Sequence, residues 1–139
     1  MDESSPNISS PHDVDCEKYH AIFAVTDLRS AIDFYTARLG FWLAFAEGDP
    51  PTFAGVNLGS VQMFLEQGIP SPQGCSVYFV VSDADKLHRF HQSSGVEIVV
   101  PPADRAYGLR DYMVRDTSGY RLTFGHHAQC ESSETTLSA

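Results

Sequence analysis

The chain has 139 residues, of which 42% are hydrophobic, and this is enough for one compact domain with its own core. Nine lysines and arginines against 18 aspartates and glutamates give a formal net charge of −9, which repels nucleic acid and anionic membranes and would attract a cationic ligand. The three cysteines lack C-x-x-C spacing, and neither a signal peptide nor a membrane span is recognisable. We therefore expect a cytoplasmic protein with no nucleic acid or membrane partner.

Both ends of the chain are polar and can bury little apolar area. We expect residues 1–17 to form a flexible N-terminal segment and residues 128–139 a disordered C-terminal tail. Residues 18–127 between them should form a single domain.

The first half of this domain, residues 18–67, predicts a strand, a helix and three further strands. The strands are rich in aromatic and β-branched residues, and the helix repeats apolar residues every three or four positions. Asp27 can cap the start of this helix and Gly40 its end. The predicted elements are 19–25, 28–39, 41–46, 52–58 and 61–66.

The second half, residues 75–127, predicts the same order of elements after a turn-rich linker. Ser82 and Asp85 have the spacing of a capping box at the start of the second helix, and Pro101 and Pro102 indicate a loop after the next strand. The predicted elements are 75–81, 84–93, 96–100, 109–115 and 120–124.

The two halves also repeat one another in sequence. HAIFAVTD at 20–27 and SVYFVVSD at 76–83 are each an apolar run that ends in an aspartate and leads into a helix. Such self-similarity indicates duplication of a structural unit. We therefore predict an α+β fold made of two βαβββ units, with space for a small ligand between their sheets.

Two motifs resemble the vicinal oxygen chelate superfamily, which includes glyoxalases, extradiol dioxygenases, fosfomycin-resistance enzymes and bleomycin-resistance proteins. V-x-D-L-x-x-A-x-x-F-Y-x-x-x-L-G-F at 25–41 is similar to the opening of that family, and V-R-D-T-S-G-Y-R-L-T-F at 114–124 is similar to its closing hairpin. The resemblance implies the paired half-barrel glyoxalase/bleomycin resistance fold and a homodimer.

Metal-dependent members of that superfamily hold one divalent ion, and the resemblance identifies the matching positions in this chain. They are His20, Phe64 (or its neighbours Gln62 and Glu66), Ser76 and Thr123. Only His20 is a convincing ligand type, and even with Glu66 too few donors remain for a divalent ion. We therefore expect no cofactor, with a divalent metal bound through His20 and Glu66 as the alternative.

Two further stretches, 53–56 and 107–112, resemble the bleomycin-resistance group, which sequesters a large cationic glycopeptide in a dimer crevice without chemistry. Tyr107 stands where that group often has a stacking aromatic residue, although it could equally pack a proline-rich loop. Arg110 and Asp111 either steer a polar ligand or form a surface pair.

The resemblance thus predicts a metal-independent small-molecule binding protein without catalytic residues. The alternative is a metal-dependent lyase, isomerase or dioxygenase of the glyoxalase type that uses His20. The candidate ligand-binding residues are His20, Phe64, Ser76, Tyr78, Tyr107, Asp111, Tyr112 and Thr123.

Overall fold

A computed structural model describes residues 12–128, which form two four-stranded sheets and two helical segments. The predicted terminal segment 1–17 lies partly, and the tail 128–139 almost wholly, outside these residues. In the first unit, β1 pairs in parallel with β4, and the strand order is β1-β4-β3-β2. Its elements are β1 (Ile22–Val25), α1 (Leu28–Asp33), the π-helical turn η1 (Phe34–Arg38), β2 (Trp42–Gly48), β3 (Pro51–Leu58) and β4 (Val61–Gln67).

The second unit repeats this topology, with β5 parallel to β8 and the strand order β5-β8-β7-β6. The predicted α+β fold of two βαβββ units is therefore confirmed. Its elements are β5 (Ser76–Val80), α2 (Ala84–Ser93), β6 (Glu97–Asp104), β7 (Leu109–Arg115) and β8 (Arg121–His127).

Both helices begin at an aspartate that follows the first strand of its unit. The Asp27 carboxylate accepts a hydrogen bond from the Ser30 amide over 3.2 Å, and Asp83 accepts one from the Lys86 amide over 3.0 Å. The capping box predicted from Ser82 and Asp85 is wrong, because Asp83 is the residue that caps α2. The aspartate at the end of each sequence repeat is therefore the N-cap of the helix that follows.

The strand β6 is longer than predicted, since it continues through Pro101 and Pro102 to Asp104. β6 lies at the edge of its sheet, and its register with β7 shifts between Val100 and Ala103, so the two prolines fall where the β6–β7 pairing is interrupted. The predicted proline loop is thus part of an edge strand.

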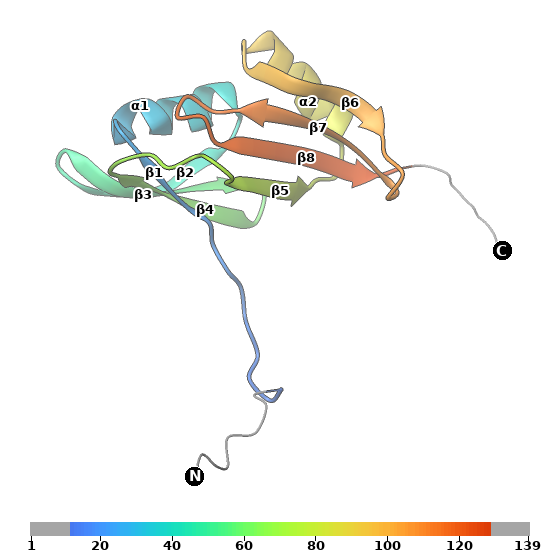
Figure 1. Cartoon of the computed structure of the whole chain (residues 1–139). Helices are drawn as coiled ribbons and strands as arrows, with labels where there is room; N and C mark the ends of the chain where they lie inside the picture. Colours follow the sequence, from blue (N-terminus) through green and yellow to red (C-terminus); the bar gives the residue numbers. More distant parts are fainter. Residues whose placement is uncertain (1–11, 129–139) are drawn as a thin grey trace.

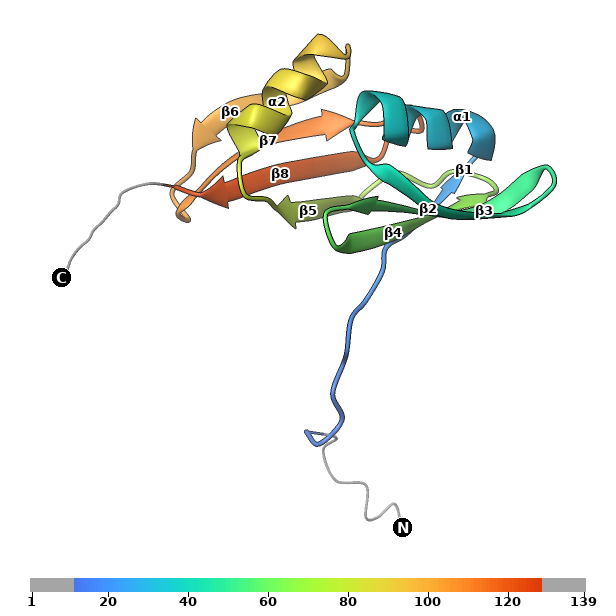
Figure 2. The same ribbon diagram turned by 180° about the vertical axis from the view of Figure 1, so that it is seen from behind.

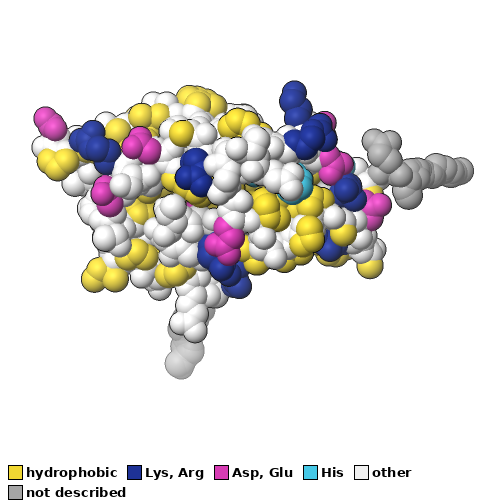
Figure 3. All heavy atoms as spheres, turned by 90° about the horizontal axis from the view of Figure 1, so that it is seen from above, with side chains coloured by type: hydrophobic (Ala, Val, Ile, Leu, Met, Phe, Trp, Pro, Cys, Tyr) yellow, Lys and Arg dark blue, Asp and Glu magenta, His cyan; other side chains and the backbone are white. Residues whose placement is uncertain are grey.

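The two helices lie on the same side of the two sheets (Figures 1 and 2). Strand residues that face this side are almost completely buried, among them Phe23, Leu65, Leu122 and Phe124. Viewed from the helix side, acidic, basic and apolar side chains are interspersed over the surface (Figure 3). We refer to the opposite side of each sheet, which neither helix covers, as the open face.

Contacts between the two units hold them as one body. The Phe41 ring packs edge-on against Phe79 with centroids 5.6 Å apart, and the Tyr35 hydroxyl donates to the Asp116 carboxylate over 2.7 Å. In addition, Nε2 of His91 on α2 donates to the main-chain carbonyl oxygen of Leu39 over 2.8 Å. The orientation of one open face relative to the other is therefore fixed by buried contacts.

Among the described residues, no helix has the length and apolar character needed to cross a membrane.

Candidate ligand-binding site

The open face of the second unit carries a cluster of aromatic and charged residues around Asp111. One carboxylate oxygen, Oδ2, accepts hydrogen bonds from the Tyr78 hydroxyl over 2.6 Å and from the Tyr107 hydroxyl over 2.5 Å. The other oxygen, Oδ1, accepts one from Nε of Arg105 over 2.8 Å. We call these four residues the tyrosine cluster.

Burial differs sharply within the tyrosine cluster. Asp111 is only 3% exposed, whereas Tyr78 is 43% and Tyr107 63% exposed. The carboxylate is therefore covered by its own partners, while the two phenol rings remain available to solvent. Because both hydroxyl groups are fixed on one oxygen atom, the rings are held in place before any ligand arrives, which lowers the entropic cost of binding.

The hydrogen bonds also determine the charge states. Burial acts to raise the pKa of the Asp111 carboxyl, but donation from Tyr107, Tyr78 and Arg105 outweighs it and lowers that pKa below its ordinary value. Burial, followed by the bond to Asp111, raises the pKa of Tyr78 well above its usual range. At neutral pH the aspartate is ionised and the tyrosine is a neutral donor.

Gly125 on β8 makes room for this cluster. It pairs with Asp111 across the β7–β8 ladder, and a Cβ atom at this position would collide with the Tyr78 hydroxyl and lie 2.8 Å from Cβ of Asp111. The absence of a side chain thus allows the Tyr78 side chain to cross the strand and reach the carboxylate. Gly55 on β3 does the same in the first unit, where the Phe45 ring lies over it.

The open face of the first unit is mainly aromatic. Phe64 lies at its centre, with ring centroids 5.1 Å from Phe53, 6.0 Å from Phe45 and 4.6 Å from His20. Such tilted contacts at 4.5–7 Å are typical of packed aromatic residues. The face therefore offers an apolar floor with the imidazole of His20 at one end.

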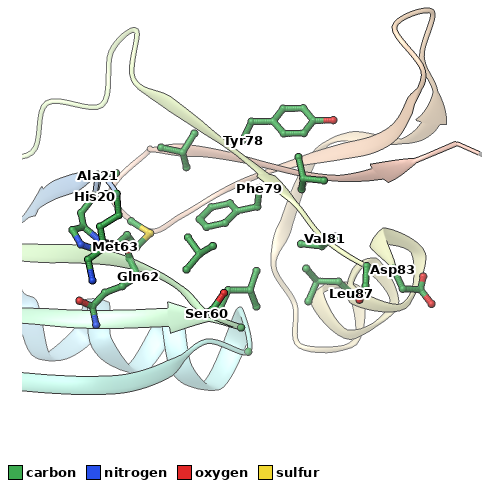
Figure 4. A pocket seen from close by; sticks show the side chains of 18 of the residues that line it. His20, Ala21, Ser60, Gln62, Met63, Tyr78, Phe79, Val81, Asp83 and Leu87 are labelled. Carbon is green, nitrogen blue, oxygen red and sulfur yellow. Dashed lines mark hydrogen bonds between the residues drawn. The ribbon is translucent and has the colours of Figure 1, made fainter. Parts of the chain in front are cut away.

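Between the two units lies a cleft of about 1210 Å³, bordered by the β3–β4 turn, the outer edge of β5 and the start of α2. In Figure 4 the Phe79, Val81 and Leu87 side chains point into it, His20 and Gln62 border it, and Tyr78 points away on the other side of β5. Its lining is mainly apolar with a few polar groups, which is the usual make-up of a small-molecule site.

The sequence model of the Glyoxalase/Bleomycin resistance protein/Dioxygenase superfamily matches residues 19–124, which is most of the chain. The chain belongs to this superfamily. The resemblance predicted from the two motifs is thereby confirmed, and the match spans both βαβββ units. No curated protein matches the chain in sequence.

Several solved structures are similar to this chain in fold. TioX from Micromonospora sp. ML1 is similar with a TM-score of 0.69 at 26% identity, over 80% of this chain and 100% of TioX. The bleomycin-binding protein from bleomycin-producing Streptomyces verticillus, solved with copper(II)-bleomycin, is similar with a TM-score of 0.65 at 22% identity, over 80% and 96%. The bleomycin resistance determinant encoded on the transposon Tn5 is similar with a TM-score of 0.69 at 18% identity, over 81% and 98%.

The metal positions of the superfamily are poorly supplied with donors in this chain. His20 Nδ1 donates to the main-chain carbonyl oxygen of Gln62 over 2.7 Å, and among residues 12–128 Nε2 makes no hydrogen bond. The Phe64 ring, which packs against His20, offers no donor, and Glu66, four residues after Gln62, lies about 13 Å from Gln62 along the strand. Among the described residues, no three His, Cys, Asp or Glu side chains are grouped to hold a metal ion. The residues present do not fit the metal of this superfamily.

The structure brings together some of the predicted site residues. Tyr78, Tyr107 and Asp111 contact one another, and Thr123 lies opposite Tyr78 in the β5–β8 ladder. The remaining predicted positions lie along β4 and at the cleft, with His20 against Phe64 and Ser76 on the free edge of β5.

Tyr112 lies apart from the other predicted site residues, and its prediction as a ligand-binding residue is wrong. Its side chain is fully buried on the helix side of β7, where its hydroxyl donates to Nδ1 of His91 over 2.8 Å. Asp111 precedes it on the same strand, and adjacent strand residues point to opposite faces. Tyr112 therefore packs the core beneath the site.

Arg105 is a site residue that the sequence reasoning missed. It lies before the β6–β7 turn, and the hairpin folds it back onto Asp111 six residues later. The one sequence feature that pointed to this contact was the presence of an arginine and an aspartate on either side of a predicted turn. For Arg110 the sequence left two alternatives, a residue that steers a ligand or a member of a surface ion pair. Arg110 forms an ion pair with Asp85, with Nε and Oδ1 3.0 Å apart.

Proposed function

We propose that this protein binds a small organic molecule on the open faces of its sheets, without a metal ion and without chemistry, as a homodimer. The observation that carries the proposal is the tyrosine cluster, where an ionised aspartate holds two exposed phenol rings in fixed positions. A planar ligand group stacked on such a ring gains about 0.5–1.5 kcal/mol beyond its burial.

The apolar surface left exposed on the strands supports the proposed homodimer. Large apolar side chains remain exposed on the open faces, including Ile22, Trp42 and Val80. Exposed apolar surface of this kind marks interaction sites. If a partner's sheet covered it, the ligand would be enclosed between two open faces, as the resemblance to bleomycin-resistance proteins implies.

A cationic ligand remains compatible with this site through its rings and not through Asp111. Both oxygen atoms of that carboxylate already accept hydrogen bonds from Tyr78, Tyr107 and Arg105. A cation would instead lie over the phenol rings, an interaction worth about 0.5–2 kcal/mol, and the net charge of −9 would favour its approach.

The test is a thermal-shift and calorimetric titration of the purified protein, made metal-free, with metal-free bleomycin and planar aromatic cations. We expect a ligand at 100 times its Kd to stabilise the fold by about 2.7 kcal/mol, and size-exclusion chromatography to give a dimer. The glyoxalase-type alternative predicts something different: stoichiometric uptake of zinc, nickel, manganese or iron that is lost in His20→Ala. That result would overturn the proposal.

A further inference from the structure

A row of polar side chains crosses the open face of the first unit beside the aromatic floor. The pairing of β1, β4, β3 and β2 brings His20, Gln62, Asn57 and Trp42 into this row, which we call the amide row. It contains two primary amides between an imidazole and an indole. Phe64 lies in the next row along β4.

Asn57 is the unusual member, since it is a polar residue only 8% exposed on a face that neither helix covers. Its Oδ1 accepts a hydrogen bond from Gln62 Nε2 over 2.9 Å. Within residues 12–128, its own amide nitrogen donates to no acceptor. A buried donor without a partner is costly, and native proteins seldom retain one.

The bond between the two amides leaves a defined pair of groups free. The side-chain carbonyl oxygen of Gln62 stays available as an acceptor, and the side-chain NH₂ of Asn57 stays available as a donor. If the two amides exchanged roles, one carbonyl and one NH₂ would still remain. The Nε2 atom of His20 adds an acceptor at the end of the row, because Nδ1 is used on Gln62.

We propose that the amide row recognises a planar ligand group that has a hydrogen-bond donor and an acceptor side by side, such as a lactam or a carboxamide. One ring of the ligand lies on Phe64. The N–H of the ligand donates to the side-chain carbonyl oxygen of Gln62, and the C=O of the ligand accepts from the side-chain NH₂ of Asn57. This inference rests on the proposed small-molecule function and adds the chemical class of the ligand.

The flanking residues fit this class. Phe64 offers a ring face next to the row, and Trp42, 53% exposed, stands opposite Asn57 in the β2–β3 ladder. A flat ligand can therefore stack on aromatic surface while its edge meets the amides. A site built to pair both groups discriminates strongly against an analogue that lacks one of them, because the protein group is then left unpaired.

The test uses quinolin-2(1H)-one, which has the donor and the acceptor, and its N-methyl derivative, which has only the acceptor. Dissociation constants are measured by following backbone amide shifts of the full chain in NMR titrations. We expect the lactam to bind at least ~10-fold tighter than the N-methyl compound, with shifts on β3 and β4.

Two variants test the residues. Gln62→Met and Asn57→Leu keep the side-chain volume and remove the polar groups, and each should reduce the lactam preference to about onefold, while the matched control Gln92→Met on α2 keeps it. Thermal denaturation of each variant shows that it is folded, and the two sites give independent readings if one of them fails to fold.

Equal affinity for the two compounds, or a preference that survives both variants, would overturn the amide row as a recognition site. Shifts confined to β5, β7 and β8 would do the same, while leaving the proposed binding function at the tyrosine cluster intact. Shifts nowhere in the chain would also overturn it, and the bleomycin titration would then decide the proposed function separately.

Discussion

The hydroxyl group of Tyr35 in the first unit donates to the carboxylate of Asp116 in the second, over 2.7 Å and 81 positions of sequence. The same carboxylate accepts the backbone amides of Ser118 and Tyr120, each over 2.9 Å, and so closes the β7–β8 turn. One buried aspartate thus joins the turn of one unit to the helix of the other.

Tyr35→Phe should destabilise the protein by about 1–3 kcal/mol, because it leaves a buried carboxylate oxygen without its donor. The free energy of unfolding from urea denaturation measures this. Tyr19→Phe is the control, since Tyr19 is 86% exposed and its loss of a hydroxyl should cost less than about 0.5 kcal/mol. An equal effect of the two substitutions would show that the hydrogen bond between Tyr35 and Asp116 contributes nothing to the free energy of unfolding.

The pH dependence of stability should carry the signature of Asp111. Its pKa is lowered in the folded protein, so the ionised form is the one that folding favours. Its contribution is therefore complete above its unfolded pKa of about 3.9 and is lost as the pH falls through the lower, folded pKa. Asp111→Asn should cost stability at pH 7 and progressively less below about pH 4.

Urea denaturation of wild type and variant between pH 7 and pH 2.5 tests this. The double variant Tyr78→Phe, Tyr107→Phe keeps the carboxylate but removes two of its donors, and its difference from wild type should narrow over the same acid range. A difference that is constant with pH would mean that the hydrogen bonds do not favour the ionised form.

Gly125 should be intolerant of even a methyl group. Gly125→Ala places a Cβ atom against the Tyr78 hydroxyl and Cβ of Asp111, so the cluster must open or the strand must shift, at a cost of about 1–3 kcal/mol. Gly68→Ala is the matched control, because its Cβ would meet only Cβ of Ala24 at an ordinary 3.6 Å. Melting temperatures compare the two, and similar values would contradict the packing described.

The strand and helix pattern predicted the fold well, because the alternation of apolar residues and the Asp27 cap are local signals, and because the repeat shows the same order of elements twice. The same alternation shows why Tyr112 was wrongly placed in the site. Asp111 and Tyr112 are neighbours on one strand, so they cannot share a face, and only Asp111 lies on the open side. Arg105 could not be placed from sequence, since its contact depends on how the β6–β7 turn folds. The buried state of Asn57 follows from pairing between strands, which no local pattern predicts.

Tyr107 separates the role of a ring from that of a hydroxyl group in ligand binding. Tyr107→Phe keeps the ring and loses the bond to Asp111, whereas Tyr107→Ala loses both. If the ring stacks on the ligand, the alanine variant should weaken binding of a planar ligand about 3–10-fold, corresponding to about 0.5–1.5 kcal/mol. The phenylalanine variant should lose less affinity, because its ring remains but is no longer fixed on the carboxylate.

Calorimetric titration of wild type and both variants with the best ligand from the thermal-shift screen gives these ratios. Ile69→Ala serves as a control for loss of an exposed apolar side chain that borders neither the cleft nor the tyrosine cluster. Alanine and phenylalanine variants with wild-type affinity would remove Tyr107 from the site and leave it as a residue that packs the β6–β7 turn. Equal losses in the two variants would instead place the effect on the hydroxyl and its hold on Asp111, so that positioning by the aspartate, and not stacking, carries the binding energy.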